Sequence, residues 1–471
     1  MNPPSFAVVG RPNKGKSSIV ATLARDDSVY IDSHAGSTRE AARFPMTVGD
    51  EVLYVLYDTP GMQRSREVLA WLEQHGGDAS SRPRTVRRFL EEHRGDSRYQ
   101  EACEMLGPVV EGAGIIYVVD GSCPFGPDYE PEMEILRWTG SPSLALINPI
   151  NNDDYVQEWR DGLSQYFRTV RVFDAHHAEF AKQLELLELF GHLDPEWRES
   201  VDRAVSALSA ERDQQHRAAG LQIADFITEA VCYNVSQPLV EGVPEEPVRK
   251  LLAGRYKSHL VKQEKRCRRR VEELFHYRHL QRSVAAIPLD DGDLFNVEQW
   301  YLWGLSRRSL LRVATASGAL VGGGAGMAVD AATGGLLGGL GTLVSGAGGA
   351  ALGRDGVVRY ADEIGQLKVR GIPTGGSKLC FGPSRNPNFP FVVLGRAMQH
   401  HRMVSQRTHA VRSTLKLDNP ALDWLSDKER RHLARIFDDI REDRKTTQRR
   451  ADLANMIENW CRSVDETLSL I

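Results

Sequence analysis

Two glycines, a lysine and a serine near the start of the chain have the types and spacing of a phosphate-binding loop. The pattern G-x-x-x-x-G-K-S directly follows the apolar run at residues 6–9 and comprises Gly10, Gly15, Lys16 and Ser17. The apolar run predicts a strand and the residues after the serine predict a helix, which is the context in which this pattern binds phosphate. The glycines let the loop curl so that its N–H groups face an anion, the lysine adds positive charge, and the serine hydroxyl can bind Mg²⁺. The expected ligand is therefore a nucleotide with its magnesium ion.

A second motif, Asp58-Thr59-Pro60-Gly61, closes an apolar run further along the chain. Runs at residues 41–48 and 52–57, joined by a Gly-Asp turn, predict a β-hairpin whose second arm ends on this motif. In P-loop enzymes a D-x-x-G at a strand end holds Mg²⁺ through a water, and its glycine N–H senses the γ-phosphate. The motif is common by itself, but its place after a phosphate loop, with a threonine loop between the two, makes the combination specific.

The elements that must position these motifs follow from the other apolar runs. Residues 115–120, 144–148 and 169–173 each carry a run of strand length. Residues 63–111, after the second motif, carry amphipathic segments and predict a helical insertion. We therefore expect residues 1–180 to form an α/β domain, with a mostly parallel sheet and flanking helices.

The segments GRPNKGKSS, GSTRE and YDTPG together resemble the Era/MnmE (TrmE-Era-EngA) branch of translation-factor-class GTPases. The resemblance implies a P-loop GTPase that hydrolyses GTP to GDP as a molecular switch, with Mg²⁺ as cofactor. It implies Lys16, Thr38 and Gly61 as the catalytic positions, and Ser17, Thr38 and Asp58 as the metal ligands. The implied nucleotide-binding positions are Gly10, Asn13, Lys14, Gly15, Lys16, Ser17, Ser18, Asn148 and Asn151.

Two residues bear on the rate of hydrolysis. Asn13 matches the asparagine that helps to hold K⁺ in potassium-activated members, and the alternative is a polar loop residue without an ion. Met62 stands where glutamine-dependent GTPases carry the side chain that positions water. Because a thioether cannot orient water, we expect intrinsic hydrolysis to be slow, or to be assisted by K⁺, by a homodimer or by another partner.

The base-recognition motif departs from the family pattern. An N-K-x-D should follow the strand at residues 144–148, but the chain has Asn148-Pro149-Ile150-Asn151, with Asp153 and Asp154 just beyond. An asparagine amide can accept a hydrogen bond from guanine but carries no charge. Guanine preference is therefore expected from the resemblance, and the residues themselves leave adenine open. The segment Asp174-Ala175-His176 lies where the second base loop belongs, and it is also degenerate.

Composition limits the class of protein. A chain of 471 residues exceeds one ordinary core, so two or three domains are expected. A net charge of -4 argues against a protein that mainly coats nucleic acid, and we regard a nucleic-acid partner as unfavoured. Six widely separated cysteines indicate neither a zinc site nor a disulfide framework. The N-terminus runs directly into a core strand, so we expect no signal peptide and a cytoplasmic location.

A narrower resemblance covers nearly the whole chain. The YDTPG segment, the long insertion, the step from Asn148 to Pro149 and the segment RNPNFP at 385–390 are similar to bacterial proteins that join a GTPase domain to a C-terminal domain of unknown function. We expect a helical domain at residues 181–295 and an α/β-to-helical domain at 357–471. In the latter, strands are expected at 366–369 and 391–394, and helices at 395–415 and 420–470.

The predicted helix at residues 249–270 is crowded with lysine and arginine. One interpretation is a solvated helix face with acidic neighbours such as Glu264 and Glu272. The other is a patch for anionic lipid or RNA. The sequence leaves both open.

Residues 313–353, within an expected segment at 296–356, are rich in glycine and aliphatic residues. Small residues recur at every fourth position, a spacing that lets two helices approach closely. The expectation is a helical hairpin that is inserted in the inner membrane or docks on it, and a soluble glycine-packed hairpin is the alternative. The aromatic residues at 300–303 suit a membrane interface but could equally lie in a core.

Three functions are compatible with these observations. The first is a GTPase switch whose nucleotide state is coupled to a membrane-associated C-terminal half, through lipid or a membrane protein. The second is a membrane scaffold or interaction protein that binds nucleotide without hydrolysing it. The third, a ribosome-associated or RNA-associated GTPase, rests on analogy with relatives and on the basic helix.

Overall fold

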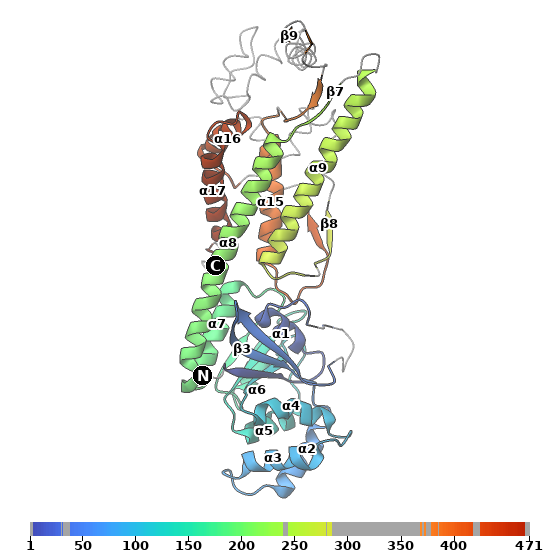
Figure 1. The fold of residues 1–471 in the computed structure, drawn as a ribbon. Helices are drawn as coiled ribbons and strands as arrows, with labels where there is room; N and C mark the ends of the chain where they lie inside the picture. Colours follow the sequence, from blue (N-terminus) through green and yellow to red (C-terminus); the bar gives the residue numbers. More distant parts are fainter. Residues whose placement is uncertain are drawn as a thin grey trace.

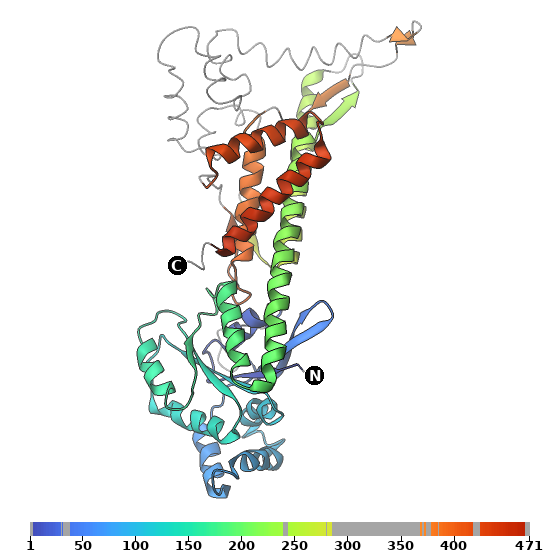
Figure 2. The same cartoon turned by 90° about the vertical axis from the view of Figure 1, so that its left-hand side faces the viewer.

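The computed structural model shows an N-terminal α/β domain from which a long helical body extends (Figure 1, Figure 2). It describes residues 3–29, 31, 38–238, 244–278, 280–284, 368–369, 372–373, 378–384, 386–417 and 424–466. The glycine-rich segment at 313–353, the aromatic residues at 300–303 and the expected domain at 296–356 lie outside these residues. No helix in the ranges just given is long and apolar enough to cross a membrane.

The N-terminal domain is built on a six-stranded sheet with the strand order β2-β3-β1-β4-β5-β6. Only the hairpin of β2 and β3 is antiparallel, and the other neighbours pair in parallel. This confirms the predicted mostly parallel sheet with flanking helices. The strands are β1 (Ser5–Val9), β2 (Ala42–Val48), β3 (Glu51–Asp58), β4 (Gly114–Asp120), β5 (Ser143–Asn148) and β6 (Val170–Val172).

Helices cover both faces of the sheet, because the central strands β1, β4 and β5 are apolar over most of their length and buried. On one face the core includes Ile19, Leu56 and Phe190, and on the other it includes Tyr117 and Trp159. The flanking helices are α1 (Lys16–Ala24), η1 (Pro127–Tyr129), α5 (Glu130–Thr139), α6 (Val156–Leu163), α7 (Phe180–Gly191) and η2 (Pro195–Trp197).

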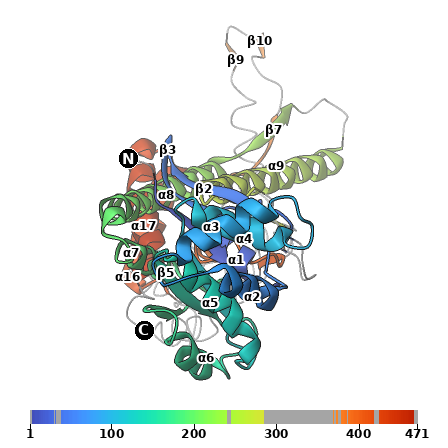
Figure 3. The same cartoon turned by 90° about the horizontal axis from the view of Figure 1, so that it is seen from below.

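The predicted insertion is helical and consists of α2 (Ser65–His75), α3 (Arg82–His93) and α4 (Gln100–Val110). The first helix ends where Gly76 adopts an extended backbone and leaves no room for a Cβ against Trp138. Helices α2 and α3 pack on α5, and α4 packs on β1. Seen from below, these helices cover the end of the N-terminal domain that points away from the helical body (Figure 3).

Helix α8 (Arg198–Cys232) links the two parts of the molecule. It has 35 residues, and at 1.5 Å per residue it is about 52 Å long. Val201 and Leu208, in its first half, belong to the core of the N-terminal domain, whereas Ile223 and Ile227 belong to the core of the helical body. One continuous helix therefore shares both cores.

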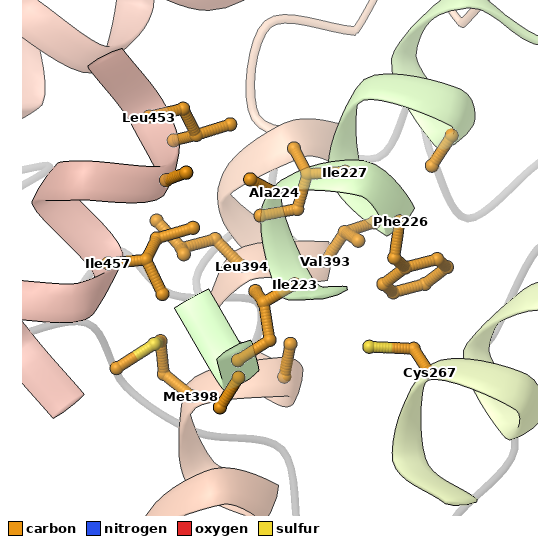
Figure 4. Close-up of a cluster of buried hydrophobic side chains, with 14 of the residues drawn as sticks. Ile223, Ala224, Phe226, Ile227, Cys267, Val393, Leu394, Met398, Leu453 and Ile457 are labelled. Carbon is orange, nitrogen blue, oxygen red and sulfur yellow. The ribbon is translucent and has the colours of Figure 1, made fainter. Parts of the chain in front are cut away.

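The helical body brings together segments that are far apart in the sequence. Helices α9 (Glu245–Leu274), α15 (Phe389–Ser405), α16 (Asp427–Arg441) and α17 (Thr446–Glu466) surround the second half of α8. Ile227, Cys267, Leu394 and Ile457 meet in its core, one from each of four helices (Figure 4). The expected segments 181–295 and 357–471 therefore contribute to one hydrophobic core.

Two short strand pairs reinforce this arrangement. Strand β7 (Val235–Pro238) pairs antiparallel with β11 (Lys378–Phe381), and β8 (Arg282–Val284) pairs parallel with β12 (Leu415–Leu417). A further pair joins β9 (Lys368–Val369) to β10 (Ile372–Pro373). In the β7–β11 and β8–β12 pairs, one strand precedes the glycine-rich segment in the sequence and the other follows it.

Three secondary-structure predictions in the C-terminal region are wrong. The expected strand at 391–394 lies inside α15, because Phe389, Val393 and Ala397 recur at helical spacing and face the core. The helix expected at 395–415 ends at Ser405, and Leu415 belongs to β12. The helix expected at 420–470 is two helices, α16 and α17, which are separated by a turn with positive φ at residues 443 and 445.

Candidate phosphate and metal site

The phosphate loop lies between the end of β1 and the start of α1. Gly10 has a φ of 139°, and a Cβ there would lie 2.4 Å from the carbonyl oxygen of Val118. Gly15 has a φ of 86° and is the N-cap of α1, which begins at Lys16. Both positions need glycine, because both have a positive φ and neither has room for a side chain. Gly10 lies against β4, and Gly15 lies against Asn148. The N–H groups at the start of α1 are thus aimed at the space above the loop, where an anion is stabilised.

Lys16 and Ser17, at the start of α1, occupy the positions that the motif predicts. Lys16 is buried, and its ammonium donates a hydrogen bond of 2.9 Å to the carbonyl oxygen of Arg11, across the loop. Burial lowers the pKa of Lys16, while Asp58 and Glu132 act in the opposite direction. Ser18, the next residue, is buried in the first turn of the helix. The lysine is therefore held over the loop by a bond that phosphate oxygens can replace.

Three oxygen ligands predicted from separate motifs meet beside the loop. The hydroxyl of Ser17 donates to Oδ2 of Asp58 at 2.7 Å, and the hydroxyl of Thr38 donates to the same oxygen at 3.4 Å. Oδ1 of Asp58 is buried and accepts no hydrogen bond from the described residues. Burial raises the pKa of this carboxyl group. A set of hydroxyl and carboxylate oxygens suits Mg²⁺, and the unpartnered oxygen fits a ligand of the metal or of its water.

Gly61 lies against the phosphate loop, and the next residue, Met62, is buried in the core. A Cβ at Gly61 would lie 2.4 Å from the Cδ atom of Pro12, so a larger residue would push the two loops apart. Met62 is 3% exposed and packs with Val9 and Val68 in the core below the sheet. The thioether therefore belongs to the hydrophobic core.

Asn148, at the end of β5, joins the two loops that border the base-binding side. Its amide nitrogen donates to the carbonyl oxygen of Lys14 at 3.4 Å, and its amide oxygen accepts from the N–H of Ala175 at 3.3 Å. Asn151 is exposed in the loop between β5 and α6. The first asparagine therefore holds the loops in place, while the second is available to solvent and to a ligand.

The sequence did not reveal the side-chain contact of Lys14. Its ammonium lies 3.3 Å from Oδ2 of Asp120, at the end of β4, and the pKa of Lys14 is raised. Asn13, beside it, has a φ of 59° and is exposed. Lys14 thus ties the loop to β4 through its side chain and contributes its backbone N–H to the loop. The sequence signal that could have revealed this contact is Asp120 at the end of the buried strand β4, because a carboxylate there is stabilised by a nearby cation.

Glu132 is a second feature that only the structure reveals. It is 1% exposed on α5, and Oε2 accepts a hydrogen bond of 3.1 Å from the hydroxyl of Tyr117. Oε1 is buried without a hydrogen bond in the described part of the chain. Burial raises the pKa of Glu132 from 4.5 to about 7, although Lys16, Tyr117 and Arg11 favour the charged form. An acidic residue in the first turn of a helix gave no sign of burial in the sequence.

We predict that Glu132→Gln stabilises the protein above neutral pH. Unfolding exposes a carboxyl group with a pKa of 4.5, so the wild-type free energy of unfolding falls as pH rises from 4.5 to about 7 and then levels off. The amide keeps the hydrogen bond from Tyr117 and does not ionise. We expect a gain of about 3 kcal/mol at pH 8 and almost none at pH 4.5. Urea unfolding of both proteins at the two pH values measures it, and an equal difference at both would contradict the burial of this charge.

The N-terminal part of the chain, which carries this site, is similar to known GTPases. Residues 5–148 match the family described as 50S ribosome-binding GTPase. A stretch of 71 residues is 42% identical to the GTPase Der of Lactobacillus helveticus, covering 15% of this chain and 16% of the relative. A stretch of 69 residues is 38% identical to the GTPase Der of Alkaliphilus oremlandii, with the same two coverages. The chain thus spans about a sixth of the length of these relatives.

Solved structures give a weaker likeness. Era in complex with MgGDPNP and a segment of 16S ribosomal RNA is 16% identical, with 58% of this chain and 90% of that chain covered and a TM-score of 0.28. An NFeoB variant of S. thermophilus bound to GMPPNP is 17% identical, with 58% and 92% covered and a TM-score of 0.24.

The C-terminal part has a family of its own. Residues 160–461 match the family described as Domain of unknown function (DUF3482), which includes the last part of the N-terminal domain and nearly all of the helical body. This match covers more than half of the chain, whereas the GTPase match ends at the close of β5. The chain therefore belongs to the DUF3482 family, with a P-loop GTPase domain at its N-terminal end.

Proposed function

We propose that the protein binds GTP with Mg²⁺ and hydrolyses it to GDP and phosphate as a molecular switch. The observation that carries this proposal is the meeting of Ser17, Thr38 and Asp58 beside Lys16. Mg²⁺, when bound there, would neutralise charge on the β- and γ-phosphates. Lys16 would hold the same phosphates, and the N–H of Gly61 would contact the γ-phosphate. Water then attacks the γ-phosphorus and the bond to GDP breaks, so that only positioning and charge are required of the protein.

Slow hydrolysis follows from the same site. Met62 is buried in the core, so the residue after Gly61 cannot orient the attacking water. The exposed Asn13 at the loop is the position from which K⁺ would assist, and a second copy of the chain or another partner could supply the missing group. We propose turnover that is stimulated by K⁺ relative to Na⁺. Complete absence of phosphate release in K⁺ buffer would favour the nucleotide-binding scaffold instead.

Nucleotide selectivity tests the proposal most directly. Fluorescent GTP, GDP and ATP analogues are titrated against the full chain with Mg²⁺, in K⁺ and in Na⁺ buffer. Binding of the guanine nucleotides alone supports the proposal and would mean that Asn148 and Asn151 suffice for base recognition. Equal binding of ATP would contradict it.

We further propose that nucleotide state reaches the helical body through the residues after α1. The guanidinium of Arg412 donates to the carbonyl oxygens of Asp27 and Val29 at 2.8 and 2.6 Å. The N–H of Arg278 donates to Oδ2 of Asp27 at 2.7 Å. Asp27 and Val29 precede Thr38 in the chain. Closure of Thr38 on a bound nucleotide would therefore strain the contacts of these two residues with the helical body.

The second base loop is held by the same body. The hydroxyl of Thr408 donates to the carbonyl oxygen of His176 at 3.1 Å, and Thr22 of α1 donates to Ala175 at 2.8 Å. Arg25, at the end of α1, is buried and forms an ion pair of 2.6 Å with Glu211 of α8. The insertion, in contrast, lies at the opposite end of the N-terminal domain (Figure 1). The proposed route to the helical body therefore runs through α1 and the base loop.

We predict that Arg412→Ala loosens this connection. Loss of the two hydrogen bonds to the segment before Thr38 should accelerate GDP release about fivefold, the equivalent of about 1 kcal/mol at a partly solvated site. Stopped-flow displacement of fluorescent GDP measures the rate. Arg402→Ala removes an exposed arginine of α15 that contacts Gln406, the residue directly after this helix, and it serves as the control. Equal release rates in wild type and Arg412→Ala would rule out this route.

We also propose that the C-terminal half works at a membrane, with the protein located at the cytoplasmic face. The support is the composition of residues 313–353 alone. Flotation with neutral phosphatidylcholine vesicles in 0.5 M NaCl tests it, because apolar insertion resists salt. Failure to float under these conditions would argue for a hairpin packed against protein.

A further inference from the structure

The acidic residues of α9 do not face solvent with its basic ones. Glu264 is 5% exposed, and its Oε1 atom accepts hydrogen bonds from Arg268 at 2.5 Å and from Arg396 of α15 at 2.8 Å. Both arginines are buried as well. This carboxylate therefore compensates charge inside the helical body, and it is not available to neutralise cations on the surface.

Glu272 behaves in the same way. It is 3% exposed, and its carboxylate contacts His400 of α15 at 3.0 Å and Arg282 of β8 at 3.1 Å. Burial keeps the pKa of His400 below its ordinary value. The interpretation of α9 as a solvated face balanced by Glu264 and Glu272 is thus wrong, because both carboxylates point into the protein.

The outer side of α9 is consequently basic. Within residues 255–270 the exposed charged side chains are all cationic, and at 3.6 residues per turn they fall on one side of the helix. We call this set the basic face, and it consists of Arg255, Lys262, Lys265, Arg266, Arg269 and Arg270. The nearest exposed acid on α9, Glu273, pairs with Arg269 at 2.9 Å.

Helix α9, which carries the basic face, runs along one edge of the helical body (Figure 1). From residue 255 to 270 it is about 22 Å long at 1.5 Å per residue. Between these positions the tyrosine, Tyr256, is buried, so no aromatic ring is exposed for stacking on bases. Proteins that bind single-stranded nucleic acid combine charge with exposed aromatic side chains. A charged line without such rings fits a planar anionic surface better.

We propose that the basic face of α9 binds the surface of a membrane that contains anionic lipids. Each lysine or arginine near such a surface contributes to binding, and the attraction falls off within a Debye length. This inference deepens the proposed membrane association but rests on a different part of the chain. Binding by the basic face requires anionic lipid and is lost at high salt. Insertion of an apolar segment does not require anionic lipid and persists at high salt.

The experiment is flotation of the full chain with vesicles of phosphatidylcholine containing about 30% phosphatidylglycerol, at 0.1 M NaCl. The variant Lys262→Gln/Lys265→Gln/Arg266→Gln removes three charges of the basic face and keeps good helix formers. Its partition coefficient should fall by about 100-fold relative to wild type. The matched control removes three exposed charges of α16, Lys428→Gln/Arg431→Gln/Arg435→Gln, and should bind as wild type does. Circular dichroism verifies that both variants remain folded.

Other outcomes overturn the proposal. Wild type that does not float with anionic vesicles, or equal losses in the two variants, would exclude a specific role for the basic face. Binding of wild type and both variants to double-stranded RNA is measured separately by titration. Binding of RNA that depends on the basic face, together with no binding to vesicles, would assign the face to nucleic acid. An α9 variant that floats as well as wild type at 0.1 M NaCl would contradict the basic face, and flotation of both proteins that survives 0.5 M NaCl would then be assigned to the proposed apolar segment.

Discussion

Replacing Lys16 by alanine is expected to lower the affinity for GTP by at least about 100-fold, since hydrogen bonds to charged groups contribute about 1.5–3 kcal/mol each and this ammonium would contact two phosphates. The ammonium donates a hydrogen bond to the carbonyl oxygen of Arg11, so the side chain is placed over the loop. Titration with a fluorescent GTP analogue measures the affinity, and phosphate release should fall to background in the same variant.

A control is needed because Lys16 is buried near two carboxylates. Its removal takes a cation away from Asp58 and Glu132, so stability without nucleotide must be compared with wild type. Lys428→Ala, on the exposed side of α16, removes a lysine that lies far from the site in the sequence and in the fold. Wild-type affinity in a folded Lys16→Ala protein would mean that the loop does not bind phosphate.

The second large effect is expected at the base. Asn151→Asp should raise the affinity for GTP by about 100-fold and leave that for ATP unchanged or lower. A carboxylate can accept hydrogen bonds from both N1 and N2 of guanine, whereas the asparagine amide has one acceptor and places its own N–H₂ towards a donor. Exchanging one neutral bond for two charge-assisted ones is worth about 2–3 kcal/mol.

The neighbouring residue supplies a matched control for this gain. Asn152 is also exposed in the loop after β5, and Asn152→Asp adds the same charge one position away. Its affinity for both nucleotides should stay near that of wild type. Equal changes in the two variants would indicate a general effect of charge. A gain for ATP as well as GTP in Asn151→Asp would place this residue outside the base pocket.

The N-terminal domain was predictable because its signals are local. The phosphate loop is a run of consecutive residues whose backbone makes the site, so its chemistry can be recognised without the fold. The central strands β1, β4 and β5 are mostly apolar because helices cover both faces of a parallel sheet. The helical body was less predictable. Local preference favours a strand for Phe391 and Val392, and packing between α8 and α9 makes the same residues helical.

Within the site, the limit of the sequence is set by side-chain direction. Motif spacing placed Ser17, Thr38 and Asp58 near one metal, and the structure brings their oxygens together. Motif spacing could not show that Met62 is buried in the core or that Glu132 is buried near Lys16. Both depend on which neighbours a helix or strand meets, and that is decided by segments outside the motif.

By itself, the sequence determined that this chain carries a phosphate loop with a metal-binding partner motif, because backbone curvature and ligand type are encoded in short runs. Only the tertiary structure decided how charge is distributed on the helical body. Glu264 and Glu272 turn inward because α15 and β8 bring Arg396, His400 and Arg282 against them. An ion pair between segments far apart in the chain has no local signature, so the basic face of α9 emerges only when those segments have packed.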